Sequence, residues 1–488
     1  MTCAPSSVLY SRSMPFGSFV YIFVFLPVAA AGYFLLRRLS NEQLPKVWLL
    51  VVSLIFVGAS GERALAVLLV SLTVNCFVAG RLVQQNKKSV LSPRVLLILG
   101  ITLNVLFLCY FKYAGFFLQT FVQLFGKQLR IPVSPFPLGI SFFTIYQIML
   151  LVQSYDGLLE QHRSLDHFVF GSMFLYVSMG PLVRWDQIVP QINDRQRWRP
   201  DADNIAKGVF LFAIGFFKKV VLADTFFRWA DAGFSYAHTL SCGGAWIAAL
   251  AFTFQLYFDF SGYTDMAIGA GWMLNLELPQ NFNAPYRAKS IIEFWRRWHI
   301  TLTDFITTYL YMPMVRAMSK ITFGKGMVIT VVAMLIAGFW HGANWTFVAF
   351  GGLHGLALVI NQVARKFKVS LPDPLAWLMT FVFVVIGFVF FRSASLRQAA
   401  DIVGSMFAFH GTRFDYEPWT GIDRVEQVTG AMCMTVGVLA VWRAPSSMQL
   451  QRDFRPSWVT LVATVALTFA ACLYSNGVVS KSFVYNEF

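Results

Sequence analysis

Long apolar runs recur along the whole sequence, and this feature limits most strongly what the chain can fold into. Hydrophobic residues make up 57% of the 488 residues, whereas charged residues make up only 13%. A helix of about 20 apolar residues spans the hydrocarbon core of a bilayer and satisfies its own backbone hydrogen bonds there. We therefore predict an all-α, polytopic membrane protein with about 11–13 transmembrane or re-entrant helices. The runs that predict them are residues 17–36, 46–59, 64–80, 94–111, 136–152, 168–183, 206–226, 244–260, 327–341, 346–363, 374–391, 428–442 and 457–475.

These runs leave no stretch that resembles a separate soluble domain of ordinary size. We expect one transmembrane domain over residues 14–475. Residues 1–13 precede a second plausible start at Met14, and we expect them to be a disordered extension. Residues 476–488 follow the last apolar run and form a C-terminal tail.

The net charge of +15 has two interpretations. A basic protein can bind nucleic acid, but in a membrane protein the excess usually reflects Lys and Arg in cytoplasmic loops. Basic residues dominate 287–326, 365–368 and 443–455, whereas 392–427 holds slightly more acidic residues. The positive-inside rule therefore predicts that the first three segments are cytoplasmic and that 392–427 lies outside. The chain then ends outside, and we expect no nucleic-acid partner.

The six cysteines are scattered and mostly lie in apolar runs, without a C-x-x-C motif or a metal-like spacing. Such cysteines usually behave as small buried hydrophobic residues. We therefore expect no bound metal ion and no bound cofactor.

The stretch EFWRRWHITLTDF, which begins at Glu293, concentrates charge in an otherwise apolar sequence. Glu293 lies four residues before Arg297, a spacing at which oppositely charged side chains pair on a helix. The pattern predicts one amphipathic helix over residues 291–311, with Trp295 and His299 on the same face. Such a helix fits either the bilayer surface or the wall of a functional site.

A histidine at membrane depth is the second unusual feature. The stretch GFWHGANWTFVAFGGLHG places His341 at the end of an apolar run, between Gly338 and Gly342. Ionisable residues inside membranes are costly and usually functional. Glycines beside them allow close approach of a helix or a substrate. A histidine packed only for structure is the alternative, and we expect that role for His354.

Two aspartates interrupt the apolar, aromatic stretch FQLYFDFSGYTDMAIG. Asp259 and Asp265 are six residues apart and fall on different faces of a helix, which argues against a paired-carboxylate acid–base site. Buried carboxylates need partners, so we expect orienting hydrogen bonds or ion pairs with arginine along an internal polar path. Ser261 and, in another run, Gln147 are candidates for the same path.

Two classes of function fit these observations. One is a transporter with a relay of histidine and aspartate, and the other is an enzyme with its site inside the membrane. Transporters of this size often contain internal repeats with paired broken helices. Neither the WRRWH nor the WHGAN stretch is repeated, which favours the enzyme.

These motifs together resemble the membrane-bound O-acyltransferase (MBOAT) family. The resemblance rests on QLYFDFSGYTDMAIG, NFNAPYRAKSIIEFWRRWHITLTDFITTYLY, GFWHGANWTFVAFGGLHG, PLGISFFT and GPLVRWDQI. It is strongest with the bacterial branch that acetylates polysaccharides such as alginate. It implies helices around a central tunnel with a cytoplasmic funnel, and a catalytic core at about residues 136–363. After the first family histidine, relatives read LRDYLYIPLGGNR where this chain has FITTYLYMPMVRAMSK, which leaves the polymer open.

The resemblance also implies roles for individual residues. His341 matches the catalytic histidine, and His299 matches the first characteristic histidine, which orients the donor thioester. The implied acyl donor is acetyl-CoA, a substrate whose phosphates basic side chains attract. The donor-binding candidates are Arg287, Lys289, Arg296 and Arg297, and further candidates for the tunnel wall are Trp340 and Asn344.

The resemblance finally implies partners and a location. The chain would lie in the bacterial inner membrane with its C-terminus in the periplasm. A periplasmic serine-hydrolase-like acetyltransferase and a polysaccharide synthesis complex would complete acetylation of an exopolysaccharide such as alginate or cellulose. Tyr485 in the tail KSFVYNEF would carry the acyl group, unless the tail only packs on the surface. The alternatives are O-acetylation of peptidoglycan or another cell-wall polymer, and acyl-group transport without transferase chemistry.

Overall fold

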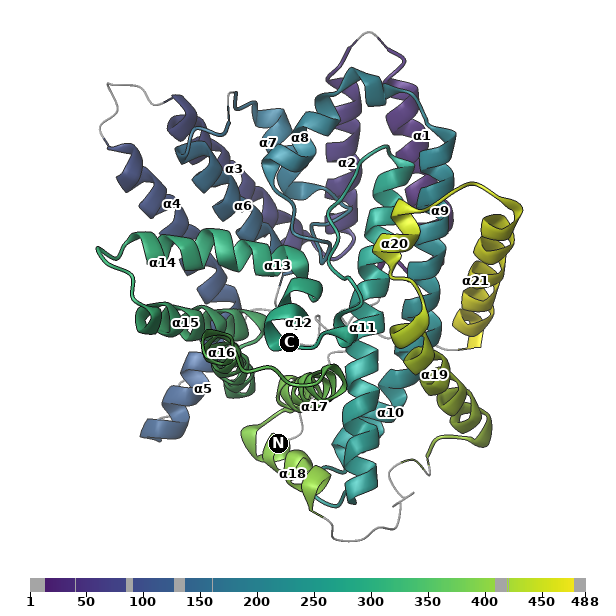
Figure 1. Cartoon of the computed structure of the whole chain (residues 1–488). Helices are drawn as coiled ribbons and strands as arrows, with labels where there is room; N and C mark the ends of the chain where they lie inside the picture. Colours follow the sequence, from purple (N-terminus) through teal and green to yellow (C-terminus); the bar gives the residue numbers. More distant parts are fainter. Residues whose placement is uncertain are drawn as a thin grey trace. The chain divides into compact units, whose positions relative to one another are not determined.

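A computed structural model describes residues 14–39, 41–84, 91–126, 137–159, 161–408, 419 and 421–477. The structure is 78% helical, and the residues that it describes form no strand (Figure 1). The prediction of an all-α fold is therefore confirmed. Tyr485 and the other tail residues from 478 to 488 lie outside the described residues, as does the expected N-terminal extension.

Six helical segments of the described chain are long and apolar enough to cross a membrane. They are Glu62–Gln84, Pro93–Val122, Phe323–His341, Trp345–Lys366, Asp373–Arg392 and Trp458–Ser475. Three shorter apolar helical segments accompany them, at Tyr21–Leu36, Leu44–Gly58 and Ile140–Tyr155. The protein is thus a multi-pass membrane protein, and the total of about 11–13 helices stays a prediction.

The chain forms two compact units. The first comprises Met1–Phe212 and Met266–Pro279, and the second comprises Ala213–Asp265 and Gln280–Phe488. The boundaries of the predicted transmembrane domain stay a prediction.

The first unit holds the N-terminal helices. Asn75 and Asn104 join α3 to α4 inside it, because their side-chain amides donate to each other's oxygens at 3.1 and 2.6 Å. Figure 1 shows α3, α4 and α6 side by side, and these three helices pack on one another. The helices of this unit are α1 (Leu26–Leu36), α2 (Leu44–Gly58), α3 (Glu62–Gln84), α4 (Pro93–Leu108), α5 (Ala114–Phe125), α6 (Ile140–Tyr155), α7 (Ser164–Ser172), α8 (Trp185–Asn193) and most of α9 (Ala202–Phe217). Short π segments, η3 (Tyr21–Phe25) and η4 (Cys109–Tyr113), and the 3-10 turn η5 (Arg195–Trp198) complete it.

The predicted span 168–183 is wrong. Helix α7 ends at Ser172, and turns and irregular backbone follow until α8 begins at Trp185. Side chains satisfy this irregular backbone, since the Tyr146 hydroxyl donates to the Tyr176 carbonyl at 3.0 Å and Ser53 Oγ accepts from the Phe174 amide at 3.1 Å. Non-helical backbone at membrane depth needs such cover by protein.

The second unit holds the candidate site. Its helices are α10 (Asp224–Ser235), α11 (Cys242–Met273, as far as Asp265), α12 (Ile291–Arg297), α13 (Ile300–Phe305), α14 (Met312–Arg316), α15 (Phe323–His341), α16 (Trp345–Lys366), α17 (Asp373–Arg392), α18 (Leu396–Phe407), α19 (Arg424–Arg443), α20 (Ser447–Arg452) and α21 (Trp458–Gly477). Shorter elements are the π segments η6 (Lys218–Ala223) and η8 (Ile306–Tyr311) and the 3-10 turn η7 (Pro285–Arg287).

Helices α15 and α16 form a tight hairpin in this unit (Figure 1). A Cβ atom added at Gly338 would lie 2.3 Å from the Phe347 carbonyl oxygen, and one added at Gly351 would lie 2.3 Å from that of Met334. Contacts this short exclude any side chain, so the two backbones touch. Gly338 therefore serves close packing of helices, one of the two roles expected for the glycines beside His341.

Candidate active site

His299 lies at a break between two helices. The predicted continuous helix over residues 291–311 is wrong, because α12 ends at Arg297 and α13 begins at Ile300. His299 itself adopts φ 44° and ψ 53°, in the left-handed region. That conformation is uncommon for a residue other than glycine and indicates that the surroundings impose it. Trp295 and His299 therefore do not share one helical face.

The preceding loop imposes this break. The Asn283 amide donates to the Arg297 carbonyl, and the Ile300 amide donates to the Asn281 carbonyl, both at 3.0 Å. Phe282 and Trp298 form an isolated antiparallel bridge between these two contacts. A short extended pairing thus replaces a turn of helix at this point. The side chain of His299 therefore does not continue the face of α12.

The side chain of Asn281 also holds this junction in place. Asn281 is fully buried, and its Oδ1 accepts from Thr301 Oγ1 at 2.6 Å and from the Thr301 amide at 3.3 Å. Its Nδ2 lies 3.5 Å from Thr264 Oγ1 on α11, where it donates. Asn281 therefore anchors the start of α13 to α11.

The imidazole of His299 is fully buried among aromatic rings. Its ring centroid lies 4.6 Å from that of Phe260, which approaches edge-on. Among the described residues, neither ring nitrogen has a hydrogen-bond partner. Burial lowers the pKa of His299 to about 3, so the side chain is neutral at physiological pH. A neutral, unpartnered imidazole at a buried position is available to a ligand.

His341 ends α15, directly before the extended Gly342. It is 6% exposed, and its ring lies 5.3 Å from Phe391 and 6.2 Å from Phe350 between centroids. The centroids of His299 and His341 are 6.5 Å apart. The structure thus brings together the two histidines that the sequence singled out.

His354 has a different environment on α16. Its Nδ1 accepts a hydrogen bond of 3.2 Å from Trp295 Nε1, and its ring lies 4.5 Å from that of Phe350. This contact joins α12 to α16. It agrees with the structural role expected for His354, and it shows that Trp295 faces α16.

The four donor-binding candidates differ in the hydrogen bonds and ion pairs that they already form within the protein. Arg287 donates to the carbonyl of Val441 at 2.8 Å, and Lys289 pairs with Asp373. Arg297 pairs with Glu293 at 2.8 Å, as its spacing predicts. Arg296 alone is exposed without a hydrogen bond or an ion pair to the described residues. It is therefore the member of this set best able to meet an external phosphate.

The buried aspartates of α11 pair with two consecutive lysines that the sequence analysis missed. Lys219 Nζ lies 2.8 Å from Asp259 and 2.9 Å from Asp224. Lys218 Nζ lies 2.7 Å from Asp265, whose Oδ2 also accepts from Ser447 Oγ at 2.7 Å. Two adjacent lysines in the predicted span 206–226 were the available signal, because charges inside an apolar run need partners.

A glycine makes these pairs possible. A Cβ atom added at Gly262, midway between the two aspartates, would lie 2.7 Å from the Gly215 carbonyl oxygen and 3.0 Å from the Lys219 amide. The backbones of α11 and of the α9–η6 segment therefore touch at this point. The aspartates serve as ion-pair partners of lysine, whereas the sequence suggested arginine.

The remaining candidates for the tunnel wall have mixed environments. Gln147, in the first unit, and Ser261, in the second, are buried with side-chain polar atoms that have no partner among the described residues. Asn344 caps α16 by accepting from the Thr346 amide at 3.1 Å and donates to the Ala394 carbonyl at 2.9 Å. Trp340 lies beside His341, with ring centroids 5.0 Å apart. The tunnel itself stays a prediction.

The fold and the paired histidines define a class that sequence comparison also supports. Residues 92–397 match the membrane-bound O-acyltransferase (MBOAT) family. The chain belongs to this family and is an O-acyltransferase. The resemblance inferred from its motifs is thereby confirmed.

Similar proteins include O-acetylating enzymes and a D-alanyltransferase of bacterial polymers. The chain is 39% identical to the peptidoglycan O-acetyltransferase of Helicobacter pylori, over 83% of this chain and 82% of that protein. It is 37% identical to the probable alginate O-acetylase AlgI of Pseudomonas aeruginosa, over 81% of this chain and 75% of that protein. It is 28% identical to the teichoic acid D-alanyltransferase of Bacillus subtilis, over 52% of this chain and 68% of that protein.

Proposed function

We propose that this protein moves acetyl groups from cytosolic acetyl-CoA across the bacterial inner membrane for O-acetylation of a cell-surface polysaccharide. The observation that carries the proposal is the pair of buried histidines, His299 and His341, with ring centroids 6.5 Å apart. A substrate atom between two such imidazoles can exchange a proton with one and receive a hydrogen bond from the other.

His341 acts as the general base in this proposal. It accepts the proton of the acceptor hydroxyl as the oxygen attacks the thioester carbon. The tetrahedral intermediate then expels the thiolate of CoA, which takes the proton back from His341. The neutral His299 donates its N–H to the developing oxyanion, a role that its unpartnered ring nitrogens fit. No charge remains on either histidine at the end of the step.

The donor's phosphates meet basic side chains of the segment 287–325. Arg296 supports this role because it is exposed and not engaged by described residues. Arg287, Lys289 and Arg297 contribute positive potential, although each also holds a structural contact. Replacing Arg296 with Gln should therefore raise KM for acetyl-CoA more than it lowers kcat.

The acetyl group must still cross to the outside. In this proposal, Tyr485 on the periplasmic tail accepts the acetyl group as an aryl ester. A phenol has an ordinary pKa near 10 and needs a neighbouring base to attack the thioester, and His341 supplies that base. A periplasmic serine-hydrolase-like acetyltransferase, working with the polysaccharide synthesis complex, then takes the acetyl group to the polymer.

The polymer is an exopolysaccharide of the alginate or cellulose type, and peptidoglycan is the alternative that the Helicobacter pylori relative favours. To distinguish them, ester-linked acetate is measured separately on exopolysaccharide and on purified peptidoglycan. The deletion strain is compared with the same strain complemented with the wild-type gene. Loss from only one fraction identifies the acceptor.

The chemistry is tested with His341→Gln in the same strain. We expect loss of polymer acetate and of CoA release from acetyl-CoA in membranes, by about 10²-fold or more. The matched control is His238→Gln, because His238 is exposed and pairs with Asp401, apart from the proposed site. Near-normal acetylation by His341→Gln, at equal protein level, would remove His341 from the catalytic role and favour simple acyl-group transport.

A further inference from the structure

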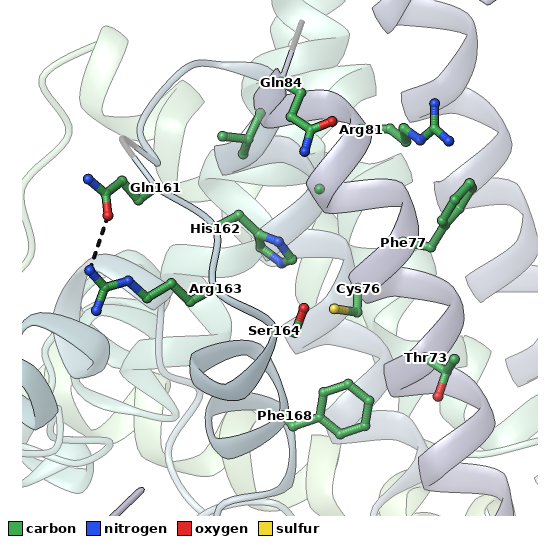
Figure 2. A pocket seen from close by; sticks show the side chains of 12 residues that line it. Thr73, Cys76, Phe77, Arg81, Gln84, Gln161, His162, Arg163, Ser164 and Phe168 are labelled. Atoms are coloured by element: carbon green, nitrogen blue, oxygen red, sulfur yellow. Dashed lines mark hydrogen bonds between the residues drawn. The ribbon is translucent and has the colours of Figure 1, made fainter. Parts of the chain in front are cut away.

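Three side chains of types that can ligate a metal ion cluster in the first unit, apart from the residues of the proposed mechanism. Cys76 belongs to α3, His162 precedes α7, and His167 belongs to α7. One ligand atom from each lies within 4.8 Å of the others. His162 Nε2 and His167 Nδ1 are 3.0 Å apart. Figure 2 shows the side chains of Cys76 and His162 at the centre of a pocket.

Neighbouring contacts hold these side chains in place. The buried Lys46 pairs with Asp166 at 2.7 Å and fixes α7 beside His167. The ring of His162 stacks on Trp185, and its Nδ1 would lie 3.5 Å from a Cβ atom added at Gly80. His162 therefore sits against the glycine one turn after Cys76 on α3.

The two imidazoles turn one nitrogen each toward the cluster and leave the other outside it. His167 is fully buried with Nδ1 toward His162, and its outer nitrogen, Nε2, has no hydrogen-bond partner among the described residues. A cavity of about 660 Å³ adjoins Cys76 and His162 and gives access for an ion and for a further ligand (Figure 2). An isolated hydrogen bond between two imidazoles would explain the 3.0 Å contact, but it leaves the position of the thiol beside both of them unexplained.

The donor set indicates which ion would fit. One thiolate and two imidazoles are typical ligands of Zn²⁺, and four residues between His162 and His167 fall within the spacing common in zinc sites. Bonds of about 2.3 Å to sulfur and about 2.0–2.1 Å to nitrogen place neighbouring ligand atoms roughly 3.3–3.7 Å apart. The observed separations reach this range through small side-chain rotations.

We propose that Cys76, His162 and His167 bind one Zn²⁺ ion, with a fourth coordination position open to the adjoining cavity. Binding releases the thiol proton of Cys76, and each histidine offers the lone pair of one neutral ring nitrogen. The proton now shared between the two imidazoles moves to an outer ring nitrogen, so the histidines release none. The site is independent of the acyl-transfer proposal, because none of its residues belongs to that mechanism.

The test uses full-length protein in detergent, stripped with a chelator and then titrated with Co²⁺ as a spectroscopic substitute for Zn²⁺. We expect one equivalent per chain, tetrahedral d–d bands and a thiolate-to-cobalt charge-transfer band. Cys76→Ser should abolish the charge-transfer band, and His162→Gln should weaken Zn²⁺ binding at least about tenfold. Cys109→Ser is the matched control, because Cys109 is a similarly half-buried free cysteine on another helix.

Absence of the charge-transfer band in the wild type, or an equal band in Cys76→Ser, would overturn the proposal. A second measurement covers variants that do not fold. In wild-type protein, Zn²⁺ should slow alkylation of Cys76 but not of Cys109, as read by mass spectrometry of the labelled peptides. Equal alkylation of Cys76 with and without Zn²⁺ would also overturn the site.

Discussion

Asn281 Oδ1 accepts a hydrogen bond of 2.6 Å from Thr301 Oγ1, and this contact fixes the chain two residues after His299. The same side chain reaches Thr264 on α11, so one amide joins three segments of the second unit. His299 owes its left-handed backbone to this arrangement and to the extended pairing beside it. Asn281 is therefore a positioning residue for the proposed site.

Replacing Asn281 with Ala should lower kcat for CoA release by about tenfold to 10²-fold, because small displacements of a catalytic group have effects of that size. KM for acetyl-CoA should change little. Asn281→Asp keeps the acceptor for Thr301 and should recover most of the rate. A purely structural role would instead lower the amount of folded protein in both variants and leave kcat per folded molecule unchanged.

The buried, neutral His299 predicts a pH dependence of stability. Its pKa is about 3 in the folded protein and about 6.5 when exposed, so the unfolded chain binds more protons below pH 6.5. The contribution of this group to the free energy of unfolding is fully present above pH 6.5. It falls as the pH decreases toward 3, by about 2 kcal/mol between pH 7 and pH 5. Thermal unfolding in detergent at these two pH values measures the change.

His299→Gln should show a smaller loss of Tm between pH 7 and pH 5 than the wild type, since glutamine does not titrate. His238→Gln, which alters an exposed histidine, should keep the wild-type difference. An identical pH dependence in wild type and His299→Gln would show that His299 is not the buried neutral group described above.

The pair formed by Lys218 and Asp265 should be sensitive to loss of one partner. Lys218→Met leaves the buried Asp265 carboxylate with the hydrogen bond from Ser447 but without its lysine, and removal of one partner of a buried ion pair costs about 3–5 kcal/mol. The double variant Lys218→Met/Asp265→Asn should recover much of that loss. Melting curves of the two single variants and the double variant complete a thermodynamic cycle, and simple additivity would contradict the coupling.

Tyr485→Phe separates a chemical role of the tail from a packing role, because it removes only the hydroxyl. We expect loss of polymer acetate, with the protein present at its normal level in the membrane. Tyr236→Phe is the control, as Tyr236 is an exposed tyrosine at the end of α10. Wild-type acetylation by Tyr485→Phe would mean that the acetyl group leaves by another route.

The features set by local sequence were predictable. Apolar runs predicted the all-α fold because burial in lipid depends on length and composition, and His341 was conspicuous because few ionisable residues interrupt such runs. The break at His299 was missed because the helical pattern continues through it. Its cause is pairing with residues 281–283, a contact that no local period records.

Contacts between distant segments account for the other omissions. Lys218 and Lys219 meet their aspartates only because Gly262 lets two backbones touch, and the sequence does not state which helices do so. Cys76 lies far from His162 in the chain, so the spacing of cysteines alone gave no indication of the metal site proposed above.

The pairing of two lysines with two aspartates also has a consequence for biogenesis. Lys218 and Lys219 follow α9, whereas Asp259 and Asp265 lie on α11, so α11 entering lipid alone would carry two uncompensated charges. The lysine segment alone would leave Lys218 uncompensated, because Lys219 can pair with the nearby Asp224. Each uncompensated charge costs about 2.5–3.5 kcal/mol at the centre of a membrane. The translocon should therefore retain the lysine segment until α11 has been synthesised, and release both into the bilayer as one ion-paired unit.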